Sequence, residues 1–145
     1  QMIEFYLILA ACATIAVGVF WRLLVGTLIM LLGGYLGEAG FINQTIGFVI
    51  GLAGWAYILY EIFAGEAGKV AADSAPESVQ SSFATMRWIV TIGWAIYPLG
   101  YFLGYMQGSV DANSLNLIYN VADVLNKIGF CLAIWVCATA ESKGK

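Results

Sequence analysis

Two residues of opposite charge, Asp123 and Lys127, stand four positions apart in the apolar stretch NVADVLNKIGF, residues 120–130. This spacing places them on one face of a helix, where each can be the partner of the other. A desolvated lysine is a good amine nucleophile toward an aldehyde, with which it forms a Schiff base. A protonated imine in an apolar site needs a fixed carboxylate nearby, and Asp123 is placed to supply one. A buried ion pair that holds the helix in register is the alternative interpretation.

The helices that must position this pair follow from composition. The 145-residue chain is 61% hydrophobic and 10% charged, whereas a soluble domain carries about 25% charged residues. Its apolar segments are each near the ~20 residues that a helix needs to cross a bilayer. They cover about residues 1–20, 22–37, 45–64, 83–107 and 114–139. We therefore expect one all-α transmembrane domain over residues 1–145, in contact with the lipid bilayer.

Charge also sets the orientation and excludes other functions. Apart from Lys127, all the basic residues fall on one side of the predicted membrane: Arg22, Lys69, Arg87, Lys143 and Lys145. The connections on the other side carry Glu38 and Asp111, so the positive-inside rule predicts a cytoplasmic C-terminus. The net charge is −3 with no basic block, which argues against nucleic-acid binding. The chain has no histidine, so we expect no His-ligated metal site.

Other side chains are predicted at the depth of Lys127, near the middle of the bilayer. An ionised group there costs at least ~2.5 kcal/mol and normally faces a cavity or a partner. The neighbouring segments bring aromatic and small residues to this depth: Met30, Gly34, Trp55, Trp94, Tyr97, Pro98 and Tyr101. On any single helix, ordinary packing explains them. Together they predict an apolar slot for an elongated conjugated aldehyde.

These motifs carry a family resemblance along the whole chain. The D-x-x-x-K motif inside LNLIYNVADVLNKIGF, together with GWAIYPLGYFLGY and QMIEFYLILAA, resembles the microbial rhodopsins, and most of all the proteorhodopsins, the light-driven proton pumps of marine bacteria. The resemblance implies a seven-helix bundle, of which these segments match the last part of the third helix through to the seventh. The chain also opens without methionine and inside an apolar pattern, so we expect a fragment of a longer protein.

The resemblance implies roles for the residues already singled out. Lys127 is the lysine that binds all-trans retinal covalently, and Asp123 is one carboxylate of the Schiff-base counterion. The retinal pocket is formed by Met30, Gly34, Trp55, Trp94, Tyr97, Pro98 and Tyr101. The primary proton acceptor and its histidine partner would lie upstream of Gln1. No metal is expected.

Two residues near the start of the chain acquire roles in the same way. Glu4 matches the cytoplasmic-side proton donor, with an acid at the end of a helix as the alternative interpretation. Gln1 matches a position that carries leucine in green-absorbing and glutamine in blue-absorbing proteorhodopsins. The implied protein is a blue-absorbing, light-driven outward proton pump rather than an enzyme. It would lie in the bacterial inner membrane as a pentamer or hexamer.

Three other functions remain open from the sequence. A sensory rhodopsin would contain the same pigment with a slow photocycle, although many sensory relatives lack a carboxylic donor such as Glu4. A channel or transporter could use Asp123 and Lys127 as an intramembrane switch and would be colourless. An aldolase-like Schiff-base enzyme is disfavoured, because no polar groups that could bind a substrate are predicted around Lys127.

Overall fold

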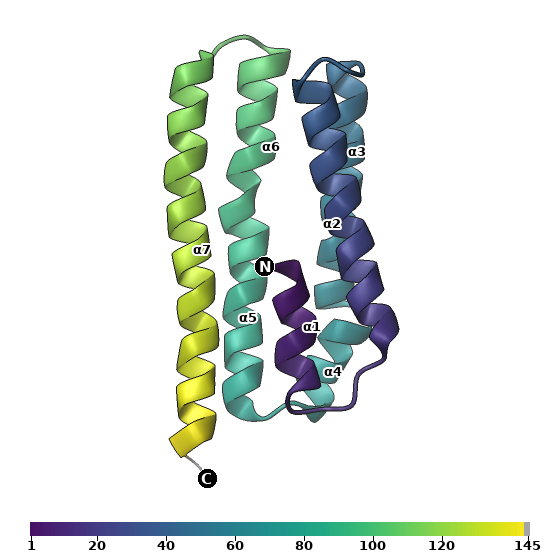
Figure 1. The fold of residues 1–145 in the computed structure, drawn as a ribbon, viewed down its shortest axis with the longest axis vertical. Helices are drawn as coiled ribbons and strands as arrows, with labels where there is room; N and C mark the ends of the chain where they lie inside the picture. The colour runs from purple at the N-terminus through teal and green to yellow at the C-terminus, as the bar shows by residue number, and fades with distance from the viewer. Residues whose placement is uncertain (144–145) are drawn as a thin grey trace.

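The computed structural model describes residues 1–143, and every regular element in that range is helical. Lys145, one of the residues behind the predicted orientation, lies outside it. The helices are α1 (Met2–Ala10), α2 (Val17–Glu38), α3 (Gln44–Phe63), α4 (Glu66–Ser74), α5 (Glu77–Ile92), α6 (Ile96–Tyr101) and α7 (Ala112–Lys143) (Figure 1). A 3-10 turn, η1 (Gly93–Ala95), precedes α6, and a π-helical turn, η2 (Phe102–Met106), follows it.

Within residues 1–143, four helical rods are long and apolar enough to cross a membrane. They cover Val17–Glu38, Gln44–Asp73, Glu77–Met106 and Ala112–Ser142. The third rod combines α5, η1, α6 and η2 into one slightly irregular helix. The predicted class, an all-α membrane protein, is therefore confirmed for the described residues.

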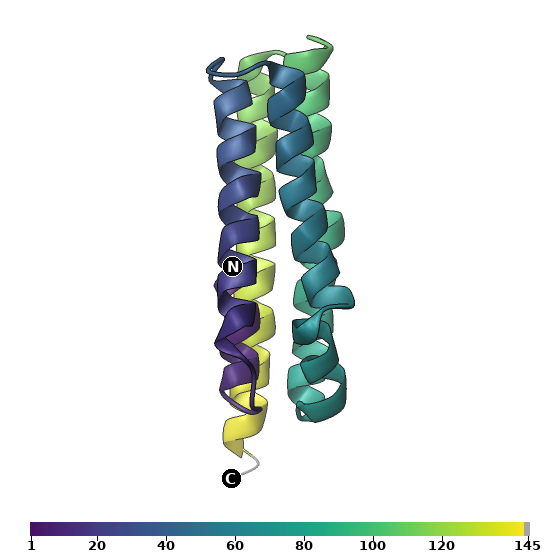
Figure 2. The same ribbon diagram turned by 90° about the vertical axis from the view of Figure 1, so that its right-hand side faces the viewer.

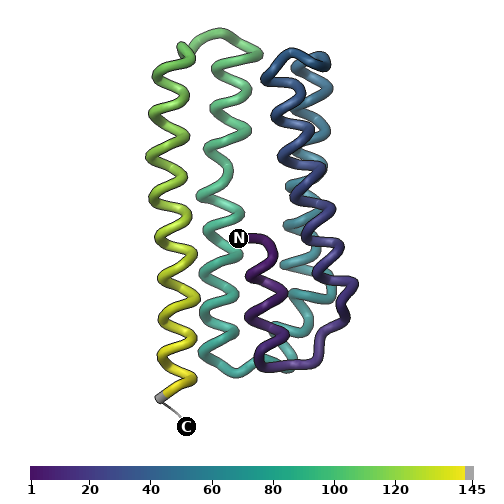
Figure 3. Tube along the Cα trace, in the orientation of Figure 1, coloured from purple at the N-terminus to yellow at the C-terminus, as the bar shows by residue number. Residues whose placement is uncertain are grey.

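The four rods run side by side along the long axis (Figures 1 and 2). The connections before α3 and before α7 lie at one end of the bundle, and α4 and the C-terminal end of α7 lie at the other. The N-terminus lies about midway along this axis (Figure 3). The short helix α1 packs against α2, α4 and α5 in one half of the bundle only.

The predicted segment 1–20 is wrong as a single helix. α1 ends at Ala10, and α2 begins at Val17, inside the range that we had assigned to the first segment. The backbone turns out of the helix before Ala16, whose N–H donates to Glu66 Oε1 at 3.3 Å. This acceptor lies 50 residues further along the chain, so an apolar pattern could not reveal where the helix ends.

Two further boundaries differ from the prediction. The stretch after α3 was expected to be a loop, but Glu66–Ser74 forms α4, with Ala67 and Ala71 buried against the core. The apolar segment of the next helix was expected from residue 83, with a turn and start signal at residues 74–77, and the helix begins within that signal, at Glu77 directly after Pro76. A proline is favourable at a helix start, where no N–H is needed. Both changes extend helix into polar sequence that carried no apolar signal.

Small residues allow α2 and α3 to approach until their backbones touch. A Cβ at Gly54 would lie 2.6 Å from the backbone nitrogen of Met30, and a Cβ at Gly47 would lie 2.6 Å from the Cα of Gly37. Membrane helices use such residues to pack closely, because lipid supplies little hydrophobic drive for their association. This contact fixes Met30 on the inner face of the bundle.

An aromatic cluster closes the half of the bundle that contains α1. The ring of Phe5 is fully buried and meets Phe83 and Phe130 edge to face, with centroids 4.9 and 5.5 Å apart. Edge-to-face geometry is favourable for aromatic pairs. Because this core joins α1, α5 and α7, it places the first residues of α1 beside the other half of the bundle.

Candidate functional site

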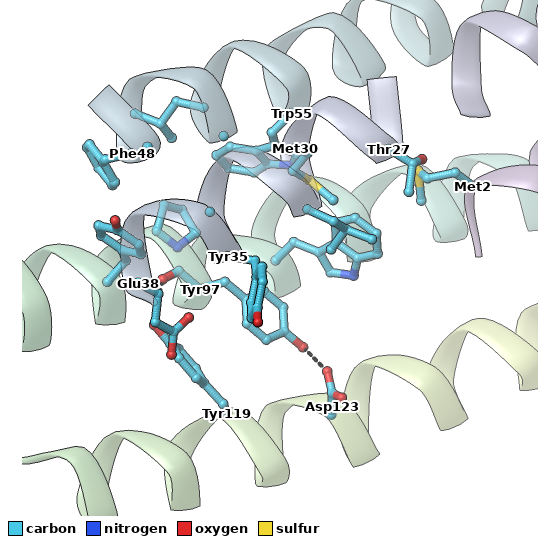
Figure 4. A pocket seen from close by; sticks show the side chains of 18 of the residues that line it. Met2, Thr27, Met30, Tyr35, Glu38, Phe48, Trp55, Tyr97, Tyr119 and Asp123 are labelled. Atoms are coloured by element: carbon cyan, nitrogen blue, oxygen red, sulfur yellow. Dashed lines mark hydrogen bonds between the residues drawn. The ribbon is translucent and has the colours of Figure 1, made fainter. Parts of the chain in front are cut away.

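A cavity of about 590 Å³ lies between the helices beyond the start of α1 (Figure 4). Its walls come from the first two residues of the chain and from α2, α3, η1, α6 and α7. Nearly all of the predicted site residues line it: Gln1, Met30, Gly34, Trp55, Trp94, Tyr97, Pro98, Tyr101, Asp123 and Lys127. The structure thus brings together residues from four segments that the sequence placed at one depth, and adds Gln1, which the family resemblance had indicated.

The charged pair forms one wall of this cavity. Lys127 Nζ donates a hydrogen bond to Asp123 Oδ2, as expected from their spacing on α7. The other carboxylate oxygen, Oδ1, accepts a hydrogen bond of 2.6 Å from the hydroxyl of Tyr97 (Figure 4). The Lys127 and Asp123 side chains are 58% and 43% exposed in the described chain. Both oxygens of the carboxylate therefore have a donor, while the amine remains accessible from the cavity.

Aromatic side chains from α3, η1 and α6 form another wall. The rings of Trp94 and Tyr97 meet edge to face with centroids 6.5 Å apart, and Tyr101 stacks on Phe48 of α3 at 5.5 Å. The Trp55 indole N–H donates to the backbone oxygen of Val90 at 3.0 Å, which fixes its ring between α3 and α5. Several polar groups of this wall are thus used within the protein, and flat apolar faces remain for a ligand.

The 3-10 turn and Pro98 lie in the same wall. Trp94 belongs to η1, and Pro98 follows it in α6. Proline lacks the N–H that would continue the hydrogen-bond ladder, so a helix can deviate from regular geometry around it. This irregularity lies at the level of the cavity.

Sequence reasoning missed several residues of the cavity. Tyr119 lies on α7 four residues before Asp123, and its hydroxyl donates to the backbone oxygen of Tyr97 at 3.0 Å. The spacing Tyr119, Asp123, Lys127 is i, i+4, i+8, so the face of α7 already contained this signal. Glu38 and Phe48 carried no comparable signal, because they lie near helix ends and reach the cavity through tertiary packing.

Glu4 is the one predicted site residue that does not line the cavity. It lies in the first turn of α1, and its Oε2 is 2.6 Å from the backbone amino group of Gln1. The Gln1 side chain does line the cavity, and its amide N–H makes a long hydrogen bond of 3.5 Å to the backbone oxygen of Asn126. Gln1 therefore lies close to α7, one helical turn from Glu4.

The shape and chemistry of the cavity fit an elongated apolar ligand with one reactive polar end. Its volume falls within the ~300–1,000 Å³ of typical small-molecule sites, and aromatic rings, methionine and glycine make up much of its lining. An amine and its carboxylate partner stand at one wall. An aldehyde that enters such a site can bond to the amine, while rings on the other helices hold its apolar body.

Comparison with known proteins agrees with this geometry. The family model for bacteriorhodopsin-like proteins matches residues 1–141. The chain belongs to the bacteriorhodopsin-like family. It is 51% identical over 98% of its length to the blue-light absorbing proteorhodopsin of Gamma-proteobacterium Hot 75m4. It is 53% identical over 96% of its length to the green-light absorbing proteorhodopsin of Gamma-proteobacterium EBAC31A08.

Solved rhodopsin structures share the fold. The crystal structure of blue light-absorbing proteorhodopsin from Med12 superposes on 97% of the chain with a TM-score of 0.78 and 44% identity. Exiguobacterium sibiricum rhodopsin superposes on 97% with a TM-score of 0.82 and 31% identity. The chain covers 61% and 66% of these two structures. It likewise covers 57% and 56% of the two proteorhodopsin sequences, so it spans little more than half of the relatives it matches.

The predicted family is thus confirmed, and with it a multi-pass membrane protein of rhodopsin type. The blue-absorbing and green-absorbing relatives are almost equally similar to the chain. Overall identity therefore does not distinguish between the two kinds of relative.

Proposed function

We propose that this chain forms the retinal-binding part of a light-driven outward proton pump of the proteorhodopsin type. The observation that carries the proposal is the Asp123–Lys127 pair at the wall of an aromatic-lined cavity of about 590 Å³. In this proposal Lys127 holds all-trans retinal covalently, and Asp123 is part of the counterion. Retinal, when bound, supplies the absorption of visible light and the isomerisation that follows it.

The hydrogen bonds around Asp123 support its role as a fixed negative charge. Tyr97 donates to one of its oxygens and Lys127 to the other, so the carboxylate is oriented by residues of two helices. Preorganised groups of this kind stabilise a charge without rearranging when it forms. Asp123 thus holds the electrostatics of the site rather than carrying the transported proton.

We propose that Glu4 is the proton donor on the cytoplasmic side. It lies outside the cavity, one helical turn from Gln1, which is within it. A carboxyl group at this place can hold a proton near the site without touching the ligand. Gln1 would make the pigment blue-absorbing, because an amide beside a chromophore changes the relative energies of its ground and excited states.

The remaining features of the proposal concern the membrane. The end of the bundle that holds α4 and the C-terminal end of α7 carries Arg22 and Lys69 in α2 and α4, whereas Glu38 ends α2 and Asp111 precedes α7 at the other end. This distribution supports a cytoplasmic C-terminus. The bacterial inner membrane is proposed from the family resemblance. A pentameric or hexameric assembly is proposed from the family resemblance.

The first test is an absorption spectrum of the whole protein with retinal, before and after hydroxylamine in the light. We expect a visible band that hydroxylamine bleaches, and no such band in Lys127→Ala. Illuminated vesicles should then show a change in pH that a protonophore abolishes, with a photocycle fast enough for pumping. A colourless wild-type protein would contradict retinal binding, and a pigment with a slow cycle and no pH change would indicate a sensory rhodopsin.

A further inference from the structure

The irregular part of the third rod is tied to α7 by side chains that donate to its backbone. Asn126 Nδ2 donates to the backbone oxygen of Gly93 at 3.0 Å, where the 3-10 turn begins. Tyr119 makes a similar hydrogen bond to the oxygen of Tyr97 one turn further along. Short 3-10 segments within a helix often occur at functional positions.

Gly93 provides the space for this contact. Its backbone angles, φ −63° and ψ −34°, are ordinary for a helix, so its conformation does not require glycine. A Cβ built on Gly93 would have three atoms of the Asn126 amide as its nearest neighbours. Cγ would lie at 3.0 Å and Nδ2 at 3.4 Å, with Oδ1 closer still. The absence of a side chain at Gly93 is therefore matched to the amide of Asn126.

Both partners adjoin residues of the cavity. Asn126 directly precedes Lys127 and lies three residues after Asp123, on the neighbouring face of α7. Gly93 directly precedes Trp94, which lines the cavity. A change in the Asn126–Gly93 distance would therefore move the charged pair relative to the aromatic wall.

We propose that Asn126 is a positioning residue: by holding the carbonyl of Gly93, its amide sets the separation between the Asp123–Lys127 pair and the wall that carries Trp94. The part of this inference that concerns a chromophore rests on the function proposed above. The contact itself belongs to the protein alone and can be tested without retinal.

A thermodynamic cycle tests the contact in the whole protein without retinal. The variants are Gly93→Ala, Asn126→Ala and the double variant, with melting followed by circular dichroism. In the wild-type background, Gly93→Ala should lower the melting temperature by roughly 2–4 °C, because the new Cβ collides with the amide. In the Asn126→Ala background, Gly93→Ala should leave the melting temperature unchanged or raise it, since alanine is favoured over glycine at helical angles. Equal effects of Gly93→Ala in both backgrounds would overturn the proposed contact.

Two matched substitutions serve as controls. Gly129→Ala adds a Cβ on α7 that meets only ordinary contact, 3.5 Å from Ile89 Cδ1. Asn120→Ala removes an exposed amide from the same helix, at a position outside the cavity lining. The effect of each control substitution on the melting temperature should be the same with and without Asn126.

The position of the visible band tests the effect on the site. With retinal bound, Asn126→Ala and Gly93→Ala should both displace the absorption maximum, the double variant should add little, and the two controls should leave it unchanged. A merely structural contact would change melting without moving the band, and that result would overturn the positioning role. A colourless wild-type protein that still shows the coupled melting behaviour would refute the proposed function and leave the contact established.

Discussion

The ion-pair network at the end of the bundle that holds α4 offers a prediction whose size follows from the structure. Arg22 binds Glu61 through Nε at 2.9 Å and Nη2 at 3.3 Å, and it binds Glu66 through Nη2 at 2.7 Å. Glu61 is 3% exposed and also accepts the N–H of Ala67 at 3.1 Å. Glu66 is 39% exposed. One arginine thus joins a buried and an exposed carboxylate.

The perturbation is Arg22→Met, which leaves the carboxylate of Glu61 buried with one backbone donor. Removing one partner of a buried pair costs about 3–5 kcal/mol. Because the Arg22 side chain is 35% exposed, we expect the lower end of this range, about 3 kcal/mol. Glu66→Gln removes only an exposed ion pair and should cost at most about 1 kcal/mol.

The decisive variant removes both Arg22 and its buried partner Glu61. Arg22→Met combined with Glu61→Leu leaves no buried charge, so its main cost is the lost acceptor for Ala67, about 1 kcal/mol. The double variant should therefore be about 2 kcal/mol more stable than Arg22→Met alone. Unfolding of the purified protein by sodium dodecyl sulfate in mixed micelles, followed by circular dichroism, measures all four proteins under one condition. If Arg22→Met is as stable as the double variant, the cost does not come from an unpaired Glu61.

Three further predictions concern other parts of the chain. Gly54→Ala should destabilise the protein by about 1–3 kcal/mol in the same unfolding assay, since its Cβ would meet the backbone of Met30. Gly51→Ala, whose Cβ would make ordinary contact at 3.4 Å, should cost clearly less, and equal costs would contradict the close helix contact. Gln1→Leu should shift the visible band to longer wavelength, and an unchanged absorption maximum would exclude Gln1 as the tuning residue. Hydrogen bonds from the side chain and backbone of Ser114 hold the pKa of Asp111, which caps α7, below its ordinary 3.8. The ionised cap therefore stabilises the helix above pH 3.8, and this stabilisation is lost as the pH falls through the lowered pKa of Asp111. Asp111→Ala should thus lower the melting temperature at pH 7 but not at the acid end of a pH series.

Many residues that line the cavity could be predicted, because helical periodicity indicates how deep in the bilayer a residue lies and on which face of its helix. Asp123 and Lys127 share a face of α7, and Trp94 and Tyr97 share a face of the neighbouring rod. In a bilayer the segments have similar lengths and run side by side, so their middles meet at the same depth. The sequence identified half of the lining, ten of the twenty residues, with Gln1 among them through the family resemblance.

The end of α1 was not predicted, because the residues after Ala10 remain apolar. The contact that follows, from Ala16 to Glu66, joins positions far apart in the chain. α4 was missed for a related reason, since its first turn is held by the buried carboxylate of Glu61. Glu61 and Glu66 both bind Arg22, and an isolated charge in the sequence does not say which acid it will bind.

Asn126 shows the same limit within the site itself. The sequence does not indicate which residue the Asn126 amide will contact. Gly93 belongs to another rod and has ordinary helical backbone angles. Only the structure shows that the amide occupies the space left by the glycine. The two residues must be considered together, because a Cβ added at Gly93 is tolerated only if the side chain at position 126 leaves room for it. For this reason the effect of Gly93→Ala should change with the residue at position 126, which no property of either residue alone would predict.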